Sequence, residues 1–145
     1  MTVPLARGPI VIDTDVYGAE LVPGSSLAAV YQPIIVGRRP AFISFQTAAE
    51  LRYGALRRNW SDSRMRKLES RIAAAETVHT GPDLVRTYAR LRVDCERIGH
   101  ALSQREHDAD RSVAATALRL GVPLVSNDGI FHNTPGLLLE TATRP

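Results

Sequence analysis

The chain has 145 residues, of which 44% are hydrophobic and 23% charged, a composition that favours one globular domain with its own core. Its single cysteine, Cys95, excludes an internal disulfide and a cysteine-rich zinc site; with no long apolar run and no secretory signal, we expect a cytoplasmic protein without a membrane partner. All but one of the 18 basic residues are arginine and the net charge is +3, a balance that does not by itself define a nucleic-acid partner.

The apolar pattern predicts strands and helices that alternate along the chain. In the first half, we expect a strand at 9–13, a helix capped by Ser25 or Ser26, a strand at 41–45, and a helix from Thr47 to Arg58. In the second half, we expect a helix through Met65, Leu68 and Ile72, a short strand at 77–79, a helix opened by Pro82, a helix at about 108–120, a strand at 123–126 and an edge strand at 137–139.

Three of these helices carry clear end signals. Thr47 and Glu50 match a capping box. Pro82 suits the first turn of the next long helix, and Gly121 suits the end of the last one. The helix that Pro82 opens has an apolar stripe at helical spacing, formed by Leu84, Tyr88, Leu91, Cys95, Ile98 and Leu102.

Continuous apolar strands that alternate with helices predict an α/β fold with a parallel sheet between helical layers, and residues 1–145 are expected to form one domain. In open sheets of this kind, ligands bind beyond the carboxyl ends of the strands. Asp13 and Asp128 both follow a predicted strand at that position.

Four segments bring an acid to this edge of the predicted sheet. The acids are Asp13, Glu50 on the first turn of its helix, Asp110 at the start of the last helix, and Asp128. Clustered carboxylates repel one another unless a cation lies between them. Mg²⁺ prefers oxygen ligands, and a metal held in this way suits the chemistry of phosphodiesters. The pattern therefore indicates a metal-dependent enzyme that acts on nucleic acid.

Each acid also has a structural explanation. Asp13 can cap the turn after its strand, Glu50 can complete the capping box, and Asp128 lies in an Asn-Asp-Gly turn. Asp108 or Asp110 can cap the last helix. Of the other polar residues, His107 is the histidine expected near the site, and Arg111 is expected on a solvated helix face.

The ordered set of motifs resembles the PIN-domain ribonucleases, and within them the VapC-type toxins of bacterial toxin–antitoxin pairs. The resemblance spans roughly residues 10–139 and is carried by Val11–Val16, Ala49–Gly54, Asp110–Ala117, Pro123–Asp128 and Phe131. It implies a PIN-like three-layer α/β/α fold, dependence on Mg²⁺ or Mn²⁺, and endonucleolytic cleavage of RNA. It also implies a cognate VapB-like antitoxin and a homodimer.

The resemblance assigns Asp13, Glu50, Asp110 and Asp128 as the catalytic and metal-binding acids. Asp15 and Asp108 are extra acids that could join the metal shell. Two other interpretations remain at this point. One is a nuclease that is not a toxin and processes RNA or cuts DNA or flap structures; the other is an inert PIN module that binds RNA or protein.

Overall fold

The computed structural model describes residues 7–143, within which five strands alternate with helices. The strands are β1 (Ile10–Ile12), β2 (Ala41–Ser44), β3 (Glu76–Val78), β4 (Leu124–Val125) and β5 (Leu139–Glu140). The α-helices are α1 (Thr14–Gly18), α2 (Ser26–Ile35), α3 (Phe45–Arg57), α4 (Asp62–Ala73), α5 (Pro82–Ile98) and α6 (Asp108–Leu120). Short 3₁₀ turns lie at Ala19–Leu21, Ala101–Ser103, Arg105–His107 and Gly129–Phe131.

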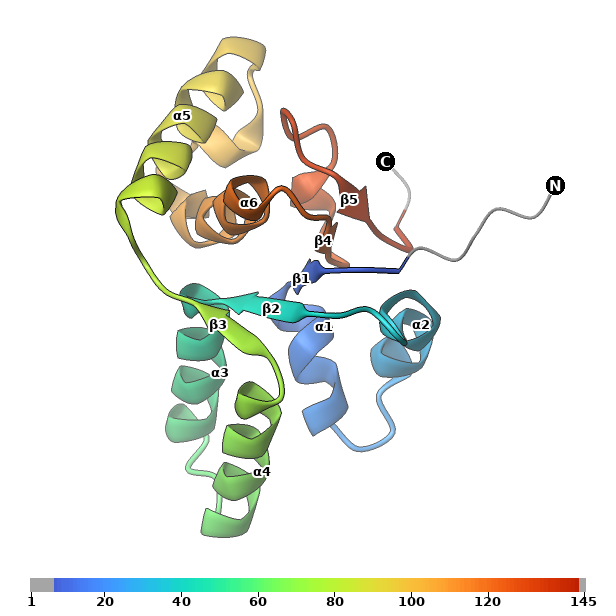
Figure 1. Ribbon diagram of the computed structural model, residues 1–145. Coiled ribbons are helices and arrows are strands. Elements are labelled where there is room, and N and C mark those ends of the chain that lie inside the picture. The colour runs from blue at the N-terminus through green and yellow to red at the C-terminus, as the bar shows by residue number, and fades with distance from the viewer. Residues whose placement is uncertain (1–6, 144–145) are drawn as a thin grey trace, which may run out of the picture.

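All strand pairs in the sheet are parallel, in the order β3-β2-β1-β4-β5. Helices α1 to α4 cover one face of the sheet and α5 and α6 cover the other (Figure 1). The predicted three-layer α/β/α fold is therefore confirmed. Because β1 lies in the centre, the residues that follow it meet the ends of β2 and β4 at one edge.

Strand β1 supplies side chains to two separate cores, because successive residues of a strand point to opposite faces. Ile10 and Ile12 pack with Val16, Tyr31 and other buried side chains on the α1–α4 side. Val11 packs on the α5–α6 side with buried residues of both helices, among them Leu91 and Cys95. A strand buried on both faces explains why Ile10–Ile12 is apolar throughout.

The start of α3 differs from the prediction. Strand β2 ends at Ser44, and the Ser44 hydroxyl accepts a hydrogen bond of 3.0 Å from the backbone N–H of Thr47. Ser44 is thus the cap, and α3 begins at Phe45, two residues earlier than expected. The predicted capping box of Thr47 and Glu50 is wrong, because Thr47 already lies inside the helix. Glu50 therefore lies on the second turn of α3, not the first.

Other boundaries agree with their local signals. Ser25 caps α2, Pro82 opens α5, and Gly121 ends α6 in the left-handed conformation at φ 68°. Two positions of the predicted apolar stripe are exceptions. Ile98 is the last residue of α5 and is 60% exposed, and Leu102 lies beyond the end of the helix, buried in the 3₁₀ turn Ala101–Ser103. The short helix α1 was missed, because five residues carry too little periodicity to detect.

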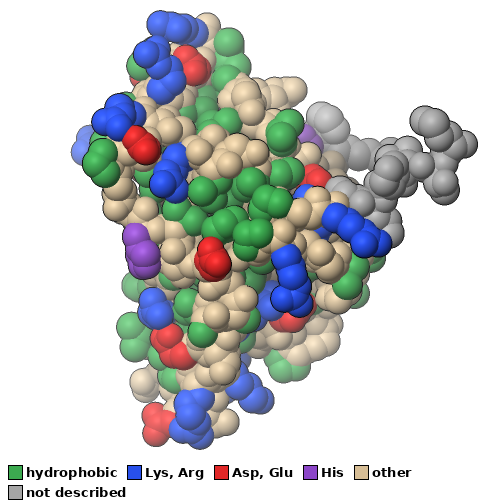
Figure 2. Space-filling model, viewed as in Figure 1, with side chains coloured by type: hydrophobic (Ala, Val, Ile, Leu, Met, Phe, Trp, Pro, Cys, Tyr) green, Lys and Arg blue, Asp and Glu red, His purple; other side chains and the backbone are tan. Residues whose placement is uncertain are grey.

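Charged side chains lie mainly on the outer faces of the helices. Figure 2 shows basic side chains spread over this face from one end of the molecule to the other, with hydrophobic side chains gathered near its middle. An exposed ion pair joins α3 to α4, where Arg52 Nε lies 2.8 Å from Glu69 Oε1. Within residues 7–143, no helix is long and apolar enough to cross a membrane.

Candidate functional site

Asp13 lies at the centre of the candidate site, directly after β1. Its Oδ1 accepts a hydrogen bond of 2.8 Å from the backbone N–H of Thr14, so it caps α1 as the structural explanation predicted. Its Oδ2 accepts a hydrogen bond of 2.7 Å from the hydroxyl of Ser126, which follows the neighbouring strand β4. The side chain is buried, with 7% exposure. Two adjacent strand ends therefore hold one carboxylate in a defined orientation.

Burial and nearby acids work against the charged form of Asp13. Its pKa is raised from 3.8 to about 7, first by desolvation and then by the negative charge of Asp15, with a further contribution from Asp110. The hydrogen bonds from Ser126 and Thr14 lower the pKa but do not offset these effects. A divalent cation would reverse this balance, because it favours the ionised carboxylate.

Asp15 lies on the first turn of α1 and faces the same edge. Its Oδ2 accepts a hydrogen bond of 3.2 Å from the backbone N–H of Asn127, and its Oδ1 accepts one of 2.7 Å from Val16. Desolvation raises the pKa of Asp15, and the charge of Asp128 raises it further. Asp15 is thus an acid beside Asp13 that belongs to the same electrostatic group.

Asp128 is linked to Asp13 through Ser126. The backbone N–H of Asp128 donates to the Ser126 hydroxyl at 3.0 Å, and that hydroxyl donates to Asp13. Asp128 is exposed, and its Oδ1 accepts a hydrogen bond of 3.0 Å from Ile130, so it also caps the turn that it begins. Asp128 can cap this turn and also bind a cation, because a carboxylate has further lone pairs that the bond from Ile130 does not use.

Glu50 reaches the site from α3. Its Oε2 accepts a hydrogen bond of 2.7 Å from the hydroxyl of Thr14, the residue after Asp13. The same hydroxyl lies 3.0 Å from that of Thr47. Glu50 Oε1 accepts a hydrogen bond of 3.1 Å from Gln46 Nε2. These contacts turn Glu50 toward the end of β1 and away from the helix terminus that it was expected to cap.

The two acids at the start of α6 have different partners. Asp108 is paired with Arg111, whereas Asp110 Oδ2 lies 3.1 Å from His107 Nδ1. Asp108 is thus engaged by a permanent cation, and Asp110 has a partner that is charged only when protonated. The helix cap is His107 and neither acid, and its place beside Asp110 confirms the expectation that His107 lies near the site.

Arg111 contradicts the expectation of a solvated face. Its side chain has 0% exposure, and Nη1 donates to the carbonyl of Leu102 at 2.5 Å and to that of Gln104 at 3.3 Å. Nη2 donates to the Tyr88 hydroxyl at 3.0 Å. These partners come from α5 and from the turns before α6, so sequence spacing could not reveal them. Arg111 anchors the end of α6 that carries Asp110.

Tyr31 is a site-supporting residue whose hydroxyl the sequence analysis missed. It lies on α2 and is fully buried. Its hydroxyl lies 3.0 Å from the carbonyl oxygen of Ser126 and 2.9 Å from Asn127 Oδ1. It therefore supports the segment that leads to Asp128. The only signal in the sequence is a tyrosine among apolar residues. Nothing in the sequence identifies its partner, the carbonyl of Ser126, which lies 95 residues further along the chain.

The acids form a shared electrostatic group without a closed cage. Within residues 7–143, no group of three or more His, Cys, Asp or Glu side chains stands ready to hold a metal ion. The charges of Asp15 and Asp110 raise the pKa of Asp13, and the charge of Asp128 raises the pKa of Asp15. This donor set fits Mg²⁺ or Mn²⁺, because every donor atom is a carboxylate oxygen. A bound cation would also offset the repulsion between the carboxylates. Mg²⁺ usually keeps several waters and takes few protein carboxylates, so it needs no closed cage.

A parallel sheet with acids at its carboxyl edge and helices on both faces defines the class of α/β proteins that bind ligands at that edge. Residues 10–137 match the family model of the PIN domain. The chain therefore belongs to the PIN-domain family, which includes nucleases and whose members generally use divalent metal ions.

Solved structures share this fold at low sequence identity. A chain of VapBC2 from Rickettsia felis, bound to a DNA fragment from the promoter, matches with a TM-score of 0.75 and 21% identity, over 92% of this chain and 98% of that one. A chain of VapBC-5 from Mycobacterium tuberculosis matches with a TM-score of 0.61 and 23% identity, over 92% and 96%. VapC20 from Mycobacterium tuberculosis, a toxin that cleaves the sarcin-ricin loop, matches with a TM-score of 0.59 and 16% identity, over 83% and 90%. Among curated protein sequences, none matches this chain.

Proposed function

We propose that this chain is a Mg²⁺- or Mn²⁺-dependent endoribonuclease that acts as the toxin of a toxin–antitoxin pair. The observation that carries the proposal is the buried carboxylate of Asp13, which lies among other acids and has a pKa raised to about 7. The cap that Asp13 provides for α1 does not explain the other acids around it, whereas clustered carboxylates are what a cation site is built from. The PIN family and the toxin-containing complexes that share the fold support the choice of nuclease.

Asp13, Glu50, Asp110 and Asp128 are the proposed catalytic and metal-binding residues. In this scheme Asp13 and Asp110 hold the principal cation, while Glu50 and Asp128 bind a second one or orient the attacking water. When bound, the cation supplies an activated water and stabilises the negative charge of the leaving oxygen. Ser126 keeps Asp13 in position, and cleavage leaves a 5′-phosphate on one product.

The contacts also give different roles to the two additional acids, Asp108 and Asp15. Asp108 is engaged by Arg111, which has 0% side-chain exposure, so we exclude Asp108 from the metal shell. Asp15 lies close enough to Asp13 to raise its pKa, so we include Asp15 as a neighbour that increases the attraction for a cation. Asp110 remains the acid that α6 contributes.

The proposed partners are RNA, a second copy of this chain and a VapB-like antitoxin. The acidic site attracts a guanidinium as well as a metal, since a bidentate contact between arginine and carboxylate is strong and geometrically specific. We therefore propose that the antitoxin inhibits the enzyme by inserting an arginine among the four acids. We also propose a cytoplasmic location. Residues 1–145 are proposed to form a single domain, because the strands from β1 to β5 share one sheet.

The test is cleavage of a single-stranded RNA by the purified chain with Mn²⁺, with Mg²⁺ and with EDTA. Wild type is expected to cut only with a metal, and Asp13→Asn to lose most of the rate. Asp62→Asn is the matched control, because Asp62 is an exposed acid on the first turn of α4. Cleavage that survives EDTA would overturn the metal mechanism. A strong preference for DNA, or no cleavage with full RNA binding, would instead select one of the alternatives.

A further inference from the structure

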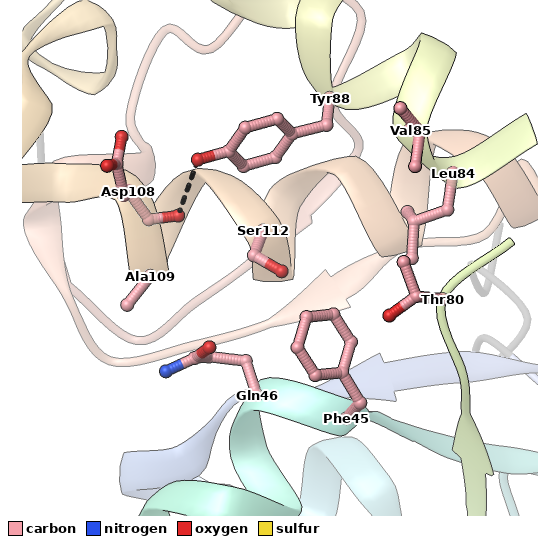
Figure 3. Close-up of a pocket in the computed structure, with 9 residues that line it drawn as sticks. All are labelled: Phe45, Gln46, Thr80, Leu84, Val85, Tyr88, Asp108, Ala109 and Ser112. Carbon is pink, nitrogen blue, oxygen red and sulfur yellow. Dashed lines mark hydrogen bonds between the residues drawn. The ribbon is translucent and has the colours of Figure 1, made fainter. Parts of the chain in front are cut away.

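A cavity of about 460 Å³ lies beside the acids, where the amino-terminal ends of α3, α5 and α6 approach one another (Figure 3). Its volume falls in the range of pockets that bind small molecules and cofactors. None of the four proposed catalytic acids lines it. The cavity therefore needs an explanation beyond the metal site.

The lining of the cavity combines aromatic walls with a few polar groups. Phe45 comes from α3 and Tyr88 from α5, while Leu84 adds apolar surface. Ser112 on α6 and Gln46 on α3 supply polar side chains (Figure 3). Flat apolar surfaces with a small number of donors and acceptors are what an unpaired nucleobase requires, since it stacks on its faces and forms hydrogen bonds at its edges.

The cavity adjoins the candidate site at two elements, α3 and α6. Gln46 lines the cavity and its Nε2 donates to Glu50 Oε1 at 3.1 Å. Asp108 and Ala109 also line it, and Asp110 follows them directly on α6. A strand whose phosphodiester lies at the acids can therefore place a neighbouring base in the cavity.

We propose that this cavity binds one unpaired base of the RNA next to the bond that is cut, and so determines which sequences are cleaved. The inference rests on the proposed function for the identity of the strand. The position of the cavity favours RNA over an apolar protein segment. Gln46 lines the cavity and donates to Glu50, so a phosphodiester bound at the acids brings a neighbouring base within reach of it.

Two tryptophan substitutions at the rim test the proposal. Val85 is 56% exposed on α5 and Thr80 is exposed just before that helix, so a larger side chain at either position can fill the cavity without disturbing the core. Val22→Trp is the matched control, because Val22 is a valine with the same exposed fraction, 56%, and does not line the cavity. Thermal melting verifies that each variant is folded.

The first measurement is the sequence on both sides of every cut in a pool of single-stranded RNA with a randomised segment, with Mn²⁺ present. Wild type and Val22→Trp are expected to show the same base preference at one flanking position, and Val85→Trp and Thr80→Trp to lose it. The second measurement is the anisotropy of a fluorescent randomised hexaribonucleotide in EDTA. Loss of one stacked base is expected to weaken binding about tenfold in both rim variants.

An unchanged preference and unchanged affinity in both folded rim variants would overturn the base pocket while leaving the nuclease intact. If the rim variants turn a dimer into a monomer and keep the preference, the cavity is a contact between copies and the proposal is also overturned. If wild type cuts no RNA, the proposed function fails, and a tenfold loss of binding in EDTA still supports the pocket. Unchanged binding in that case overturns both.

Discussion

Replacement of Asp13 by asparagine in the metal-free protein is expected to stabilise the fold above neutral pH. The carboxyl has a pKa of about 7 in the folded protein and 3.8 as its ordinary value, a difference of about 3 units. This corresponds to about 4 kcal/mol of unfavourable free energy once Asp13 is ionised in both states. Asparagine keeps the shape without the charge, and a weakened hydrogen bond from Ser126 offsets about 1 kcal/mol of the gain.

The sign of the pH dependence follows from the direction of the shift. Between pH 3.8 and about 7, the folded protein holds a proton on Asp13 that the unfolded chain has released, so stability falls as the pH rises through this window. Asp15 acts in the same direction, because its pKa is also raised. From pH 5 to pH 8, the free energy of unfolding of wild type is expected to fall by about 3 kcal/mol through Asp13 alone.

Urea-induced unfolding in EDTA at pH 5 and pH 8 measures this difference directly. Asp13→Asn is expected to lose most of the pH dependence and to exceed wild type at pH 8. Asp62→Asn removes an exposed acid of α4 and is expected to keep the slope of wild type. A wild-type stability that rises from pH 5 to pH 8, or an equal slope in Asp13→Asn, would refute the account of the buried carboxylate.

Three further outcomes are expected. Mg²⁺ or Mn²⁺ should raise the melting temperature of wild type, because a ligand of the folded state stabilises it, and Asp110→Asn should lose most of this gain; equal responses would show that Asp110 is not a ligand. In urea unfolding, Arg111→Met should lower the free energy of unfolding by about 2–4 kcal/mol through lost buried hydrogen bonds, whereas Arg52→Met on the surface should change it by less than about 1 kcal/mol; similar losses would contradict the anchoring role of Arg111. Growth should stop on expression of wild type, resume on co-expression of the neighbouring gene and be unaffected by Asp13→Ala; harmless expression of an active wild type would indicate a processing nuclease.

Strand positions were predictable because each buried strand is a short apolar run with a turn or an acid at its end. Asp13 shows why this rule also locates a candidate site, since the residue after a central parallel strand must lie at the carboxyl edge. Gly121 and Pro82 mark helix ends through backbone preferences that act locally. These features depend on neighbours in the chain, so sequence alone reveals them.

Contacts between distant segments were not predictable in the same way. Thr47 and Glu50 have the spacing of a capping box. Ser44 caps α3 instead, because β2 ends at Ser44, one residue before the predicted end of the strand. The residues on either side of Arg111 resemble those around a surface arginine. Arg111 is a buried anchor because it donates to the Leu102 carbonyl, before α6, and to the Tyr88 hydroxyl on α5. Both errors arise because the hydrogen-bond partner of a polar side chain depends on the folded structure and cannot be read from the neighbouring sequence.

The measurement that tests the central claim most directly is the anomalous scattering of Mn²⁺ in crystals of the chain soaked with that ion. The account predicts a peak between the carboxylates of Asp13 and Asp110, at roughly 2 Å from their oxygens, which is lost in Asp110→Asn. It would be contradicted by a preparation that cuts RNA with Mn²⁺ and yet binds the ion only elsewhere on the molecule.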